Sequence, residues 1–549
     1  MPQLFRPNGV WLFAIACTAT FACGDASCGD APRRPNVVWI NCEDLDDALG
    51  CYGDAYASTP RLDALARESV LYRQAIANAP ICSPARSCLV TGVYPTSLGT
   101  HHLRCETALP DAIRPLSSLL REQGYYATSA FKTDYNFSAE DAFDYRGDSL
   151  APWRGRAPDQ PFFSFIVLGT THEGPANNRQ RYNEATRKLP DDRRHNPQLA
   201  TLPPYFPDTP RLRELWAQYY DLTSAMDLQV GEILTNLRQD GLLENTVVWF
   251  FSDHGFGVPR HKRWLLDSGL RVPLLIRFPE NFPELAGGLE RGSETERLVS
   301  FVDFAPTTLS QATASIPAWM RGKVFTGPLA YQPREFAFAA RDRADDMFEL
   351  SRAVHSGRYL YVRNYLPHLP NFQGGRINSN AKEFNAALRA PEATPPTAAA
   401  DSLWRETKPL EEFYDLQSDP WELCNLADAP EYEERIASYR QRLHSWILAE
   451  RDVAFLPEAE AQRRASEQGR SIYTMARDDS AYALREALAA AERVGQSPNP
   501  VDLKSAHAEV RYWGVVALQA QLDVQPSERS ALIELLDDPC PSVAVAAAE

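Results

Sequence analysis

The sequence lacks an excess of basic residues, and beyond its first two dozen positions it lacks any long apolar run. Its 56 lysines and arginines stand against 72 aspartates and glutamates, which gives a net charge of −16. This balance argues against nucleic acid as a general partner, because nucleic-acid binding needs clustered positive charge. The short apolar runs predict no integral membrane span. A local anion site is still compatible with this composition, since local and net charge can differ.

The cysteines do not form the tightly paired set of a disulfide framework. Of the ten, Cys17, Cys23 and Cys28 lie in the N-terminal leader and tail. The other seven are widely scattered: Cys42, Cys51, Cys82, Cys88, Cys105, Cys424 and Cys540. An odd number leaves at least one thiol unpaired, and no pairing follows from the sequence alone.

The first 30 residues have the pattern of a targeting segment followed by a mobile tail. Arg6 precedes an apolar stretch from Val10 to Cys23 that is too short to span a bilayer, and small residues follow it. We interpret this as a secretory signal, so the protein is expected to be periplasmic or secreted. Cys23 offers the alternative of a lipidated N-terminus, which the preceding Thr20-Phe21-Ala22 fits less well.

A chain of 549 residues is too long for one compact core. After the first 30 residues, its composition divides it into three regions. Strands and helices alternate in residues 31–340. Residues 341–455 predict a smaller α+β subdomain, with strands at Arg358–Arg363 and Phe413–Leu416, a loop over 374–405 and a helix over Glu431–Glu450. Residues 456–549 are rich in alanine and charge, and a weak repeat of 33 residues resembles HEAT-type helical repeats. The alternative is a simple Ala-rich helical appendage.

The alternation in residues 31–340 predicts an α/β fold with a large, mostly parallel sheet between helices. Continuous apolar runs of the kind found in buried strands occur at Asn36–Ile40, Tyr125–Phe131, Phe162–Leu168, Thr246–Phe251 and Val272–Phe278. Helices are expected at Thr59–Ser69, Ser117–Gln123 and Leu212–Arg238.

Four of these apolar runs end in chemically active side chains: Glu43 and Asp44, Lys132, His172, and Asp253 with His254. The active site of such a sheet lies beyond the carboxyl ends of its strands, so these residues are expected to converge. Carboxylate oxygens with a single imidazole suit calcium or magnesium better than zinc. Together with Arg86, Lys132, Lys262 and His172, they describe a pocket for a tetrahedral oxyanion.

A further short segment, Cys82 to Gly92, predicts a helix with a thiol at its start. Ser83 is expected to cap the helix, Pro84 suits its first turn, and Gly92 can end it in a left-handed conformation. Backbone N–H groups at a helix start favour negative charge. Cys82 is therefore either a reactive centre or a small buried residue, and the segment alone does not decide between the two.

Cys82-Ser83-Pro84-Ala85-Arg86, continued by Leu89-Val90-Thr91-Gly92, resembles the C-x-P-[S/A]-R signature of type I sulfatases, whose cysteine becomes formylglycine. Further ordered matches cover most of residues 35–430: Asn36–Asp44, Ser252–Gly255, His261–Pro273, and Phe413–Leu416 with Asp419-Pro420. The resemblance implies an alkaline phosphatase-like fold.

The resemblance also implies roles for single residues. Hydrated formylglycine at position 82 would attack sulfur, and Arg86 would stabilise it. Glu43, Asp44, Asp253, His254 and the modified Cys82 would hold calcium. Lys132 and Lys262 would hold the sulfate oxygens, and His172 would protonate the leaving group. A formylglycine-generating or anaerobic maturation enzyme would be a partner.

The sequence departs from the family pattern at a few positions. Glu43 replaces a usual aspartate, His254 a usual asparagine, and Asp134 follows Lys132 where a histidine is usual. These variants look like bacterial polysaccharide, heparan-type and N-sulfoglucosamine sulfatases, which favours a sulfated carbohydrate as substrate. His102, Asp134 and Arg341 are candidate substrate-binding residues; His101 and His368 are weaker candidates.

The sequence thus predicts an exported sulfuric ester hydrolase. Two alternatives are kept: a phosphodiesterase or phosphonate monoester hydrolase on the same fold, and a non-catalytic sulfated-glycan-binding protein if Cys82 is unmodified.

Overall fold

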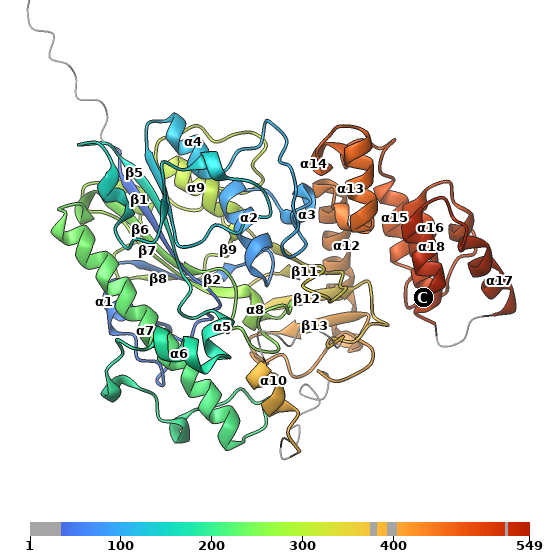
Figure 1. Cartoon of the computed structure of the whole chain (residues 1–549), viewed down its shortest axis with the longest axis horizontal. Helices are drawn as coiled ribbons and strands as arrows, with labels where there is room; N and C mark the ends of the chain where they lie inside the picture. Colours follow the sequence, from blue (N-terminus) through green and yellow to red (C-terminus); the bar gives the residue numbers. More distant parts are fainter. Residues whose placement is uncertain (1–33, 374–381, 392, 394–402, 522–524) are drawn as a thin grey trace, which may run out of the picture. The chain divides into compact units, whose positions relative to one another are not determined.

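The computed structural model describes residues 34–549 except 374–381, 392, 394–402 and 522–524 (Figure 1). Its larger sheet has the strand order β4-β3-β5-β1-β6-β7-β2-β8, with β9 also paired to β2. Within the described sheet only β7 runs against its neighbours, so the sheet is mostly parallel. The strands are β1 Asn36–Cys42, β2 Val70–Ile76, β3 Tyr126–Ala130, β4 Tyr145–Gly147, β5 Phe162–Leu168, β6 Thr246–Ser252, β7 Arg271–Arg277, β8 Glu294–Thr295 and β9 Val299–Ser300.

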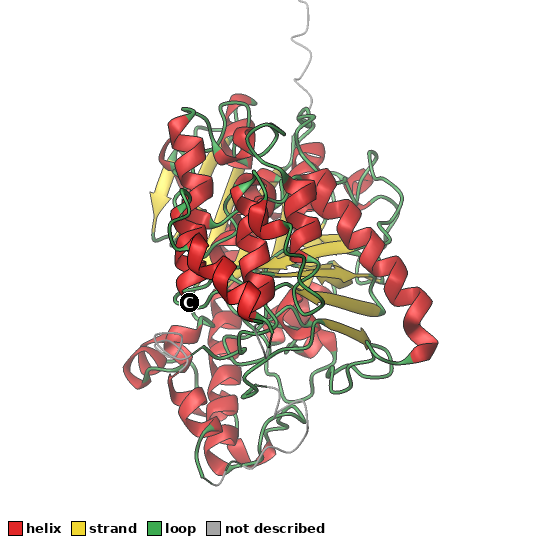
Figure 2. Ribbon diagram, turned by 90° about the vertical axis from the view of Figure 1, so that its right-hand side faces the viewer, coloured by secondary structure: helices red, strands yellow, loops and turns green. Residues whose placement is uncertain are grey.

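Helices cover both faces of this sheet (Figure 2). Trp39 of β1 packs in a core shared with α2, α4 and α9, whereas its neighbour Ile40 packs in a second core shared with α1 and α7. This division follows from the alternation of side chains along a strand. The helices of this region are α1 Pro60–Ala66, α2 Cys82–Thr91, α3 Pro95–Leu98, α4 Leu116–Glu122, α5 Glu173–Ala176, α6 Arg179–Ala185, α7 Pro210–Gln239, α8 Asp267–Leu270 and α9 Phe304–Gln311.

The five predicted strands and three predicted helices of this region are confirmed to within a few residues. Strand β2 was not predicted. Arg73 and Gln74 interrupt its apolar run, and its pairing with β7 is irregular between Tyr72 and Ala75. The antiparallel direction of β7 likewise has no signature in its sequence, because its side chains are buried like those of a parallel strand.

A second, antiparallel sheet has the order β10-β11-β12-β13, made of Ala337–Arg341, Ser351–His355, Tyr359–Asn364 and Glu411–Asp415. Helix α12, Glu433–Glu450, packs against it: the Tyr439 ring lies 5.6 Å from Phe413 and 6.5 Å from Tyr361. The predicted strands and helix are confirmed. The predicted loop over 374–405 is wrong at α10, Lys382–Leu388, and parts of it lie outside the described residues.

The C-terminal region is helical, as expected from its composition. It contains α13 Glu458–Glu467, α14 Ile472–Met475, α15 Leu484–Ala491, α16 Ala508–Gln519, α17 Pro526–Leu535 and α18 Pro541–Ala548. Helices α16 and α18 share a small core that includes Val515, Leu518, Val543 and Ala546. The HEAT-type repeat and the three domain boundaries stay predictions. The predicted signal segment lies outside the described residues. Among those described, no helix combines the length and apolar character required to cross a bilayer.

A buried ion network joins the small sheet to the segment after α12. Arg352 on β11 is fully buried and lies 3.0 Å from Asp342 and 2.6 Å from Asp452. Burial raises the pKa of the Asp342 carboxyl, Arg352 opposes the shift and Asp452 adds to it, and the resulting pKa is about 7.

This raised pKa predicts a pH-dependent stability. The folded chain binds more protons than the unfolded chain between about pH 4 and pH 7, so the free energy of unfolding should fall as the pH rises through that window. Asp342→Asn should remove this fall. In urea titrations, the free energy of unfolding of the variant minus that of the parent should therefore be larger at pH 8 than at pH 5. Asp346→Asn, at an exposed neighbour, is the matched control. Parallel pH profiles of Asp342→Asn and the parent would contradict the assignment.

Candidate active site

The register of three central strands brings distant acidic and basic segments together. Cys42 at the end of β1 pairs with Ser252 at the end of β6 and with Leu168 at the end of β5. The residues that follow each strand therefore leave the sheet at one edge. The Asp44 backbone N–H donates to Asp253 Oδ1 over 3.1 Å, which ties two of these segments together across 209 positions of sequence.

Helix α2 delivers Cys82 to the same place. Cys82 is the first residue of the helix, all ten residues of α2 are buried, and Gly92 ends it with φ 65°, as predicted. The predicted Ser83 cap is wrong: Ile81 occupies the N-cap position, and Ser83 Oγ accepts instead from the Arg104 N–H at 3.1 Å. Cys82 Sγ lies 3.3 Å from His254 Nε2.

Potential metal ligands surround Cys82. His254 Nε2 lies 3.4 Å from Asp44 Oδ1 and 3.7 Å from Asp253 Oδ1, and all three side chains are fully buried. Ligand atoms of Asp44, Cys82 and His254 lie within 4.8 Å of one another, and so do those of Glu43, Cys82 and His172. A donor set dominated by carboxylate oxygens fits a hard divalent cation.

Three cationic side chains complete the cluster. Arg86 Nη2 lies 2.8 Å from Glu43 Oε1 and 3.0 Å from Asp253 Oδ2. Lys132 Nζ lies 2.5 Å from the same Glu43 oxygen, and Lys262 Nζ lies 2.9 Å from Asp44 Oδ2. Arg86 is fully buried, yet its Nη1 has no hydrogen-bond partner among the described residues. An unsatisfied buried donor is costly, so this nitrogen marks a place for a ligand oxygen.

These charges set the ionisation of the two groups in contact. Burial alone would raise the pKa of the Cys82 thiol, but Lys262, His254 and Lys132 lower it to about 6. Burial would lower the pKa of His254, but Asp253, Cys82 and Asp44 raise it to about 9. At neutral pH an unmodified Cys82 is therefore a thiolate beside an imidazolium, unlike an inert core cysteine.

His172 lies at the rim of the cluster, directly before α5. Its Nδ1 accepts a hydrogen bond from the Gly174 N–H at 3.1 Å, which places the single proton of the neutral ring on Nε2. Burial alone would lower the pKa of His172, but the Asp44 carboxylate raises it above the usual value. The ring also lines a surface cleft shared with Glu43, Thr170 and Arg181.

Sequence reasoning missed Glu173, although it directly follows His172. Its carboxylate is buried and contacts Lys262 Nζ at 3.2 Å and Arg263 Nη1 at 2.9 Å. Its backbone N–H donates to Asp44 Oδ2 at 2.8 Å. The only signal was its place beside a predicted catalytic histidine, since one acidic residue after a strand is usually a surface residue.

The three predicted substrate-binding residues occupy different places. Asp134 lies beside the cluster, with Oδ2 3.2 Å from Lys132 Nζ. His102 faces α13, with Nε2 3.7 Å from Glu458 Oε2, and Arg341 lies over the Trp264 ring, 5.2 Å from its centroid. His102 and Arg341 thus contact groups outside the cluster, and the predicted roles of all three stay predictions.

A family model described as sulfatase matches residues 35–314 of this chain. An ulvan-active sulfatase of Formosa agariphila is 35% identical over 473 residues, covering 78% of this chain and 77% of the relative. The chain belongs to the sulfatase family. The resemblance seen in the sequence is confirmed, and the sulfatase is a sulfuric ester hydrolase.

Two further comparisons agree with this assignment. The human N-sulphoglucosamine sulphohydrolase is 26% identical over 472 residues, covering 76% of the sulfatase described here and 90% of the human protein. The solved structure of a 2-O GAG sulfatase superposes with a TM-score of 0.56 at 20% identity, covering 77% and 93% of the two chains. The latter likeness confirms the α/β fold with its mostly parallel sheet.

Proposed function

We propose that this sulfatase removes a sulfate group, as an ester or an N-sulfate, from a carbohydrate. The observation that carries the proposal is Cys82 at the start of α2, in contact with His254 and facing the charges of Lys132 and Lys262. The similarity to an ulvan-active sulfatase and to an N-sulphoglucosamine sulphohydrolase favours a carbohydrate substrate.

We further propose that Cys82 is converted to formylglycine by a maturation enzyme. The partnerless Arg86 Nη1 fits this modification, because it leaves one buried donor for an added oxygen. Once formed, a hydrated formylglycine supplies a diol oxygen as the nucleophile toward sulfur.

The carboxylate oxygens of Glu43, Asp44 and Asp253, with the His254 imidazole, fit a calcium ion, which these residues would hold. Such an ion supplies positive charge that polarises an S–O bond. Arg86 bridges Glu43 and Asp253 and so offsets part of the repulsion between these two carboxylates.

The remaining residues bind the substrate and move a proton. Lys132 and Lys262 both act electrostatically on Cys82, and their ammonium groups can hold sulfate oxygens and stabilise the charge that develops during transfer. His172 carries a proton on Nε2 beside the cleft, as a general acid for the leaving oxygen or nitrogen requires.

Mass spectrometry of the peptide that contains residue 82, taken from the native host, tests the modification directly. An aldehyde at position 82 is expected. An unmodified thiol would overturn the formylglycine proposal and favour the non-catalytic glycan-binding alternative. Comparing rates on an aryl sulfate and on a phosphodiester then tests the reaction, and a preference for the phosphodiester would favour the phosphodiesterase or phosphonate monoester hydrolase alternative.

Removal of metal should abolish activity. Treatment with a calcium chelator is expected to lower kcat/KM by at least about 100-fold, since the charge acting on the S–O bond is lost. Calcium should restore the rate better than magnesium, whose octahedral demands suit this flexible set of donors less well. Full activity after exhaustive chelation, checked by elemental analysis, would contradict the calcium proposal.

We also propose that the sulfatase is exported, on the strength of the leader pattern in residues 1–30. N-terminal sequencing of protein from the native host tests this: a mature chain that begins near Cys23 is expected, and a retained Met1 would exclude cleavage.

A further inference from the structure

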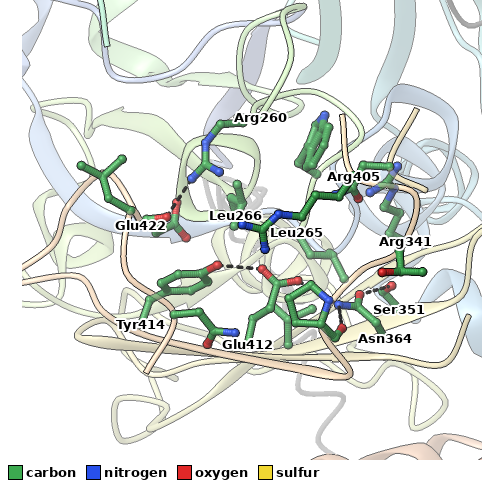
Figure 3. A pocket seen from close by; sticks show the side chains of 17 residues that line it. Arg260, Leu265, Leu266, Arg341, Ser351, Asn364, Arg405, Glu412, Tyr414 and Glu422 are labelled. Carbon is green, nitrogen blue, oxygen red and sulfur yellow. Dashed lines mark hydrogen bonds between the residues drawn. The ribbon is translucent and has the colours of Figure 1, made fainter. Parts of the chain in front are cut away.

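A separate cavity of about 240 Å³ lies between the segment 260–266 and the small antiparallel sheet (Figure 3). Arg260, Trp264 and Leu266 line it from one side, and Ser351, Asn364 and Tyr414 line it from the sheet. None of its lining residues belongs to the Cys82 cluster. Its volume falls just below the usual range of about 300–1,000 Å³ for ligand pockets, which suits one small unit.

Arg341 brings an incompletely paired cation to this cavity. Its side chain is 7% exposed, and its Nε has no hydrogen-bond partner among the described residues. Its nearest carboxylate is Glu349, 3.6 Å from Nη1, but Glu349 also holds the buried Lys408 through an ion pair. Glu349 is therefore shared between two cations, and Glu412 is the other carboxylate whose charge acts on both.

Arg260 adds a second such cation from the opposite wall. It is 4% exposed, and it donates through Nη2 only to the backbone carbonyls of Trp421 and Glu422, at 3.0 and 2.9 Å. Its Nε has no hydrogen-bond partner in the described part of the chain, and its guanidinium lies over the Tyr205 ring, 4.6 Å from the centroid. Desolvation and the nearby Asp267 raise the pKa of the buried Glu422 well above its usual value, and Arg260 opposes that shift.

A third arginine, Arg405, and the Trp264 ring complete the lining. Figure 3 shows Arg405 reaching over the cavity between Arg260 and Arg341. Among the described residues of the lining, Glu412 is the one acidic group besides Glu422, and it already accepts from Tyr414 Oη at 2.7 Å and Asn364 Nδ2 at 2.8 Å. Buried cations are retained where an anion compensates them, and guanidinium groups pair with both carboxylate and sulfate oxygens.

We infer that this cavity binds one acidic sugar unit, through its carboxylate or sulfate, at a site distinct from Cys82. The partnerless Nε–H groups of Arg260 and Arg341 would donate to the anionic oxygens, and the Trp264 ring would contact the sugar. This inference rests on the proposed carbohydrate substrate. The site would hold a second unit of a polyanionic chain while another unit reacts at Cys82.

The experiment uses the full-length Cys82→Ala variant, so that bound sugars are not consumed. Calorimetry with glucuronate, glucose 6-sulfate and glucose gives the affinity and the number of sites. An acidic sugar is expected to bind and glucose is not. A further Arg341→Gln substitution should weaken this binding at least tenfold, whereas Arg358→Gln, an exposed arginine next to the same sheet, should leave it unchanged. Glucuronate binding without glucose 6-sulfate binding at this site would assign the anion as a carboxylate, and the reverse as a sulfate.

A second variant keeps the test valid if Arg341→Gln does not fold. Thr407 lies exposed at the cavity lining, and Thr407→Trp should block the site without removing a charge. Binding that survives both Arg341→Gln and Thr407→Trp would overturn the inference, and so would the absence of any binding by either acidic sugar. Failure of the proposed function would give a different result. In that case glucose 6-sulfate would show no binding site that is lost in Lys262→Met, whereas the site that depends on Arg341 would remain.

Discussion

Replacing Cys82 by alanine is expected to abolish sulfate-ester hydrolysis while leaving the protein folded. Loss of a covalent nucleophile lowers kcat by about 10⁴-fold or more, because the remaining groups then act only by binding and charge stabilisation. The Cys82 side chain is small and buried, and it contacts His254 at 3.3 Å and lies near His172, so its removal should cost only about 1 kcal/mol of stability. Initial rates on an aryl sulfate, with urea unfolding of the same preparation, measure both effects.

Cys88 provides the matched control on the same helix. It is fully buried, its Sγ donates to Asn78 Oδ1 at 3.0 Å, and burial raises the pKa of its thiol well above the usual value. Cys88→Ala should therefore lower stability by about 1–2 kcal/mol and keep most of the activity. A folded Cys82→Ala variant with unchanged turnover would exclude Cys82 as the nucleophile, and an unfolded one would assign it a structural role.

Replacing Glu173 by glutamine should weaken both the fold and the reaction. Its carboxylate lies between Lys262 and Arg263, so the neutral amide leaves two buried cations short of one negative charge. Removing one partner of a buried ion pair typically costs about 3–5 kcal/mol of unfolding free energy. Because Lys262 loses one of its two anchors, kcat/KM should also fall at least about tenfold. Urea titrations and steady-state kinetics measure the two changes.

Glu296→Gln is the control for this substitution. Glu296 is exposed and belongs neither to the Cys82 cluster nor to the cleft beside His172, so the same chemical change should alter the stability by less than about 0.5 kcal/mol. If Glu173→Gln were as stable and as active as Glu296→Gln, then Glu173 would not position Lys262.

The parts of the fold that the sequence predicts best are those with one dominant local signal. The runs Phe162–Leu168 and Thr246–Ser252 are apolar throughout because both faces of β5 and β6 are buried, and their polar neighbours fix where each strand ends. The rule for parallel sheets then places Glu43 near Asp253 without any knowledge of distances. The sulfatase signature around Cys82 fixed the family and the reaction class.

Features that depend on tertiary contacts were not predictable in this way. Ser83 has the composition of a helix cap, but its hydroxyl accepts from Arg104 because the loop after α3 lies against α2. Glu173 is one of 72 acidic residues, and only the folded chain shows that it faces Lys262 and Arg263. Charge pairs of this kind leave no periodic pattern in the sequence, whereas the packing of apolar side chains does.

The pairing of β1 with β6 also determines when, during synthesis and folding of the chain, the Cys82 cluster can form. Asp44 and Asp253 are 209 positions apart, so a chain emerging from the ribosome cannot assemble the cluster until strand β6 and Lys262 have been synthesised. Closing so long a loop is a late step in folding. When it is complete, Cys82 is only 3% exposed and every residue of α2 is buried. Before this strand pairing closes, the segments that enclose Cys82 are not yet in place.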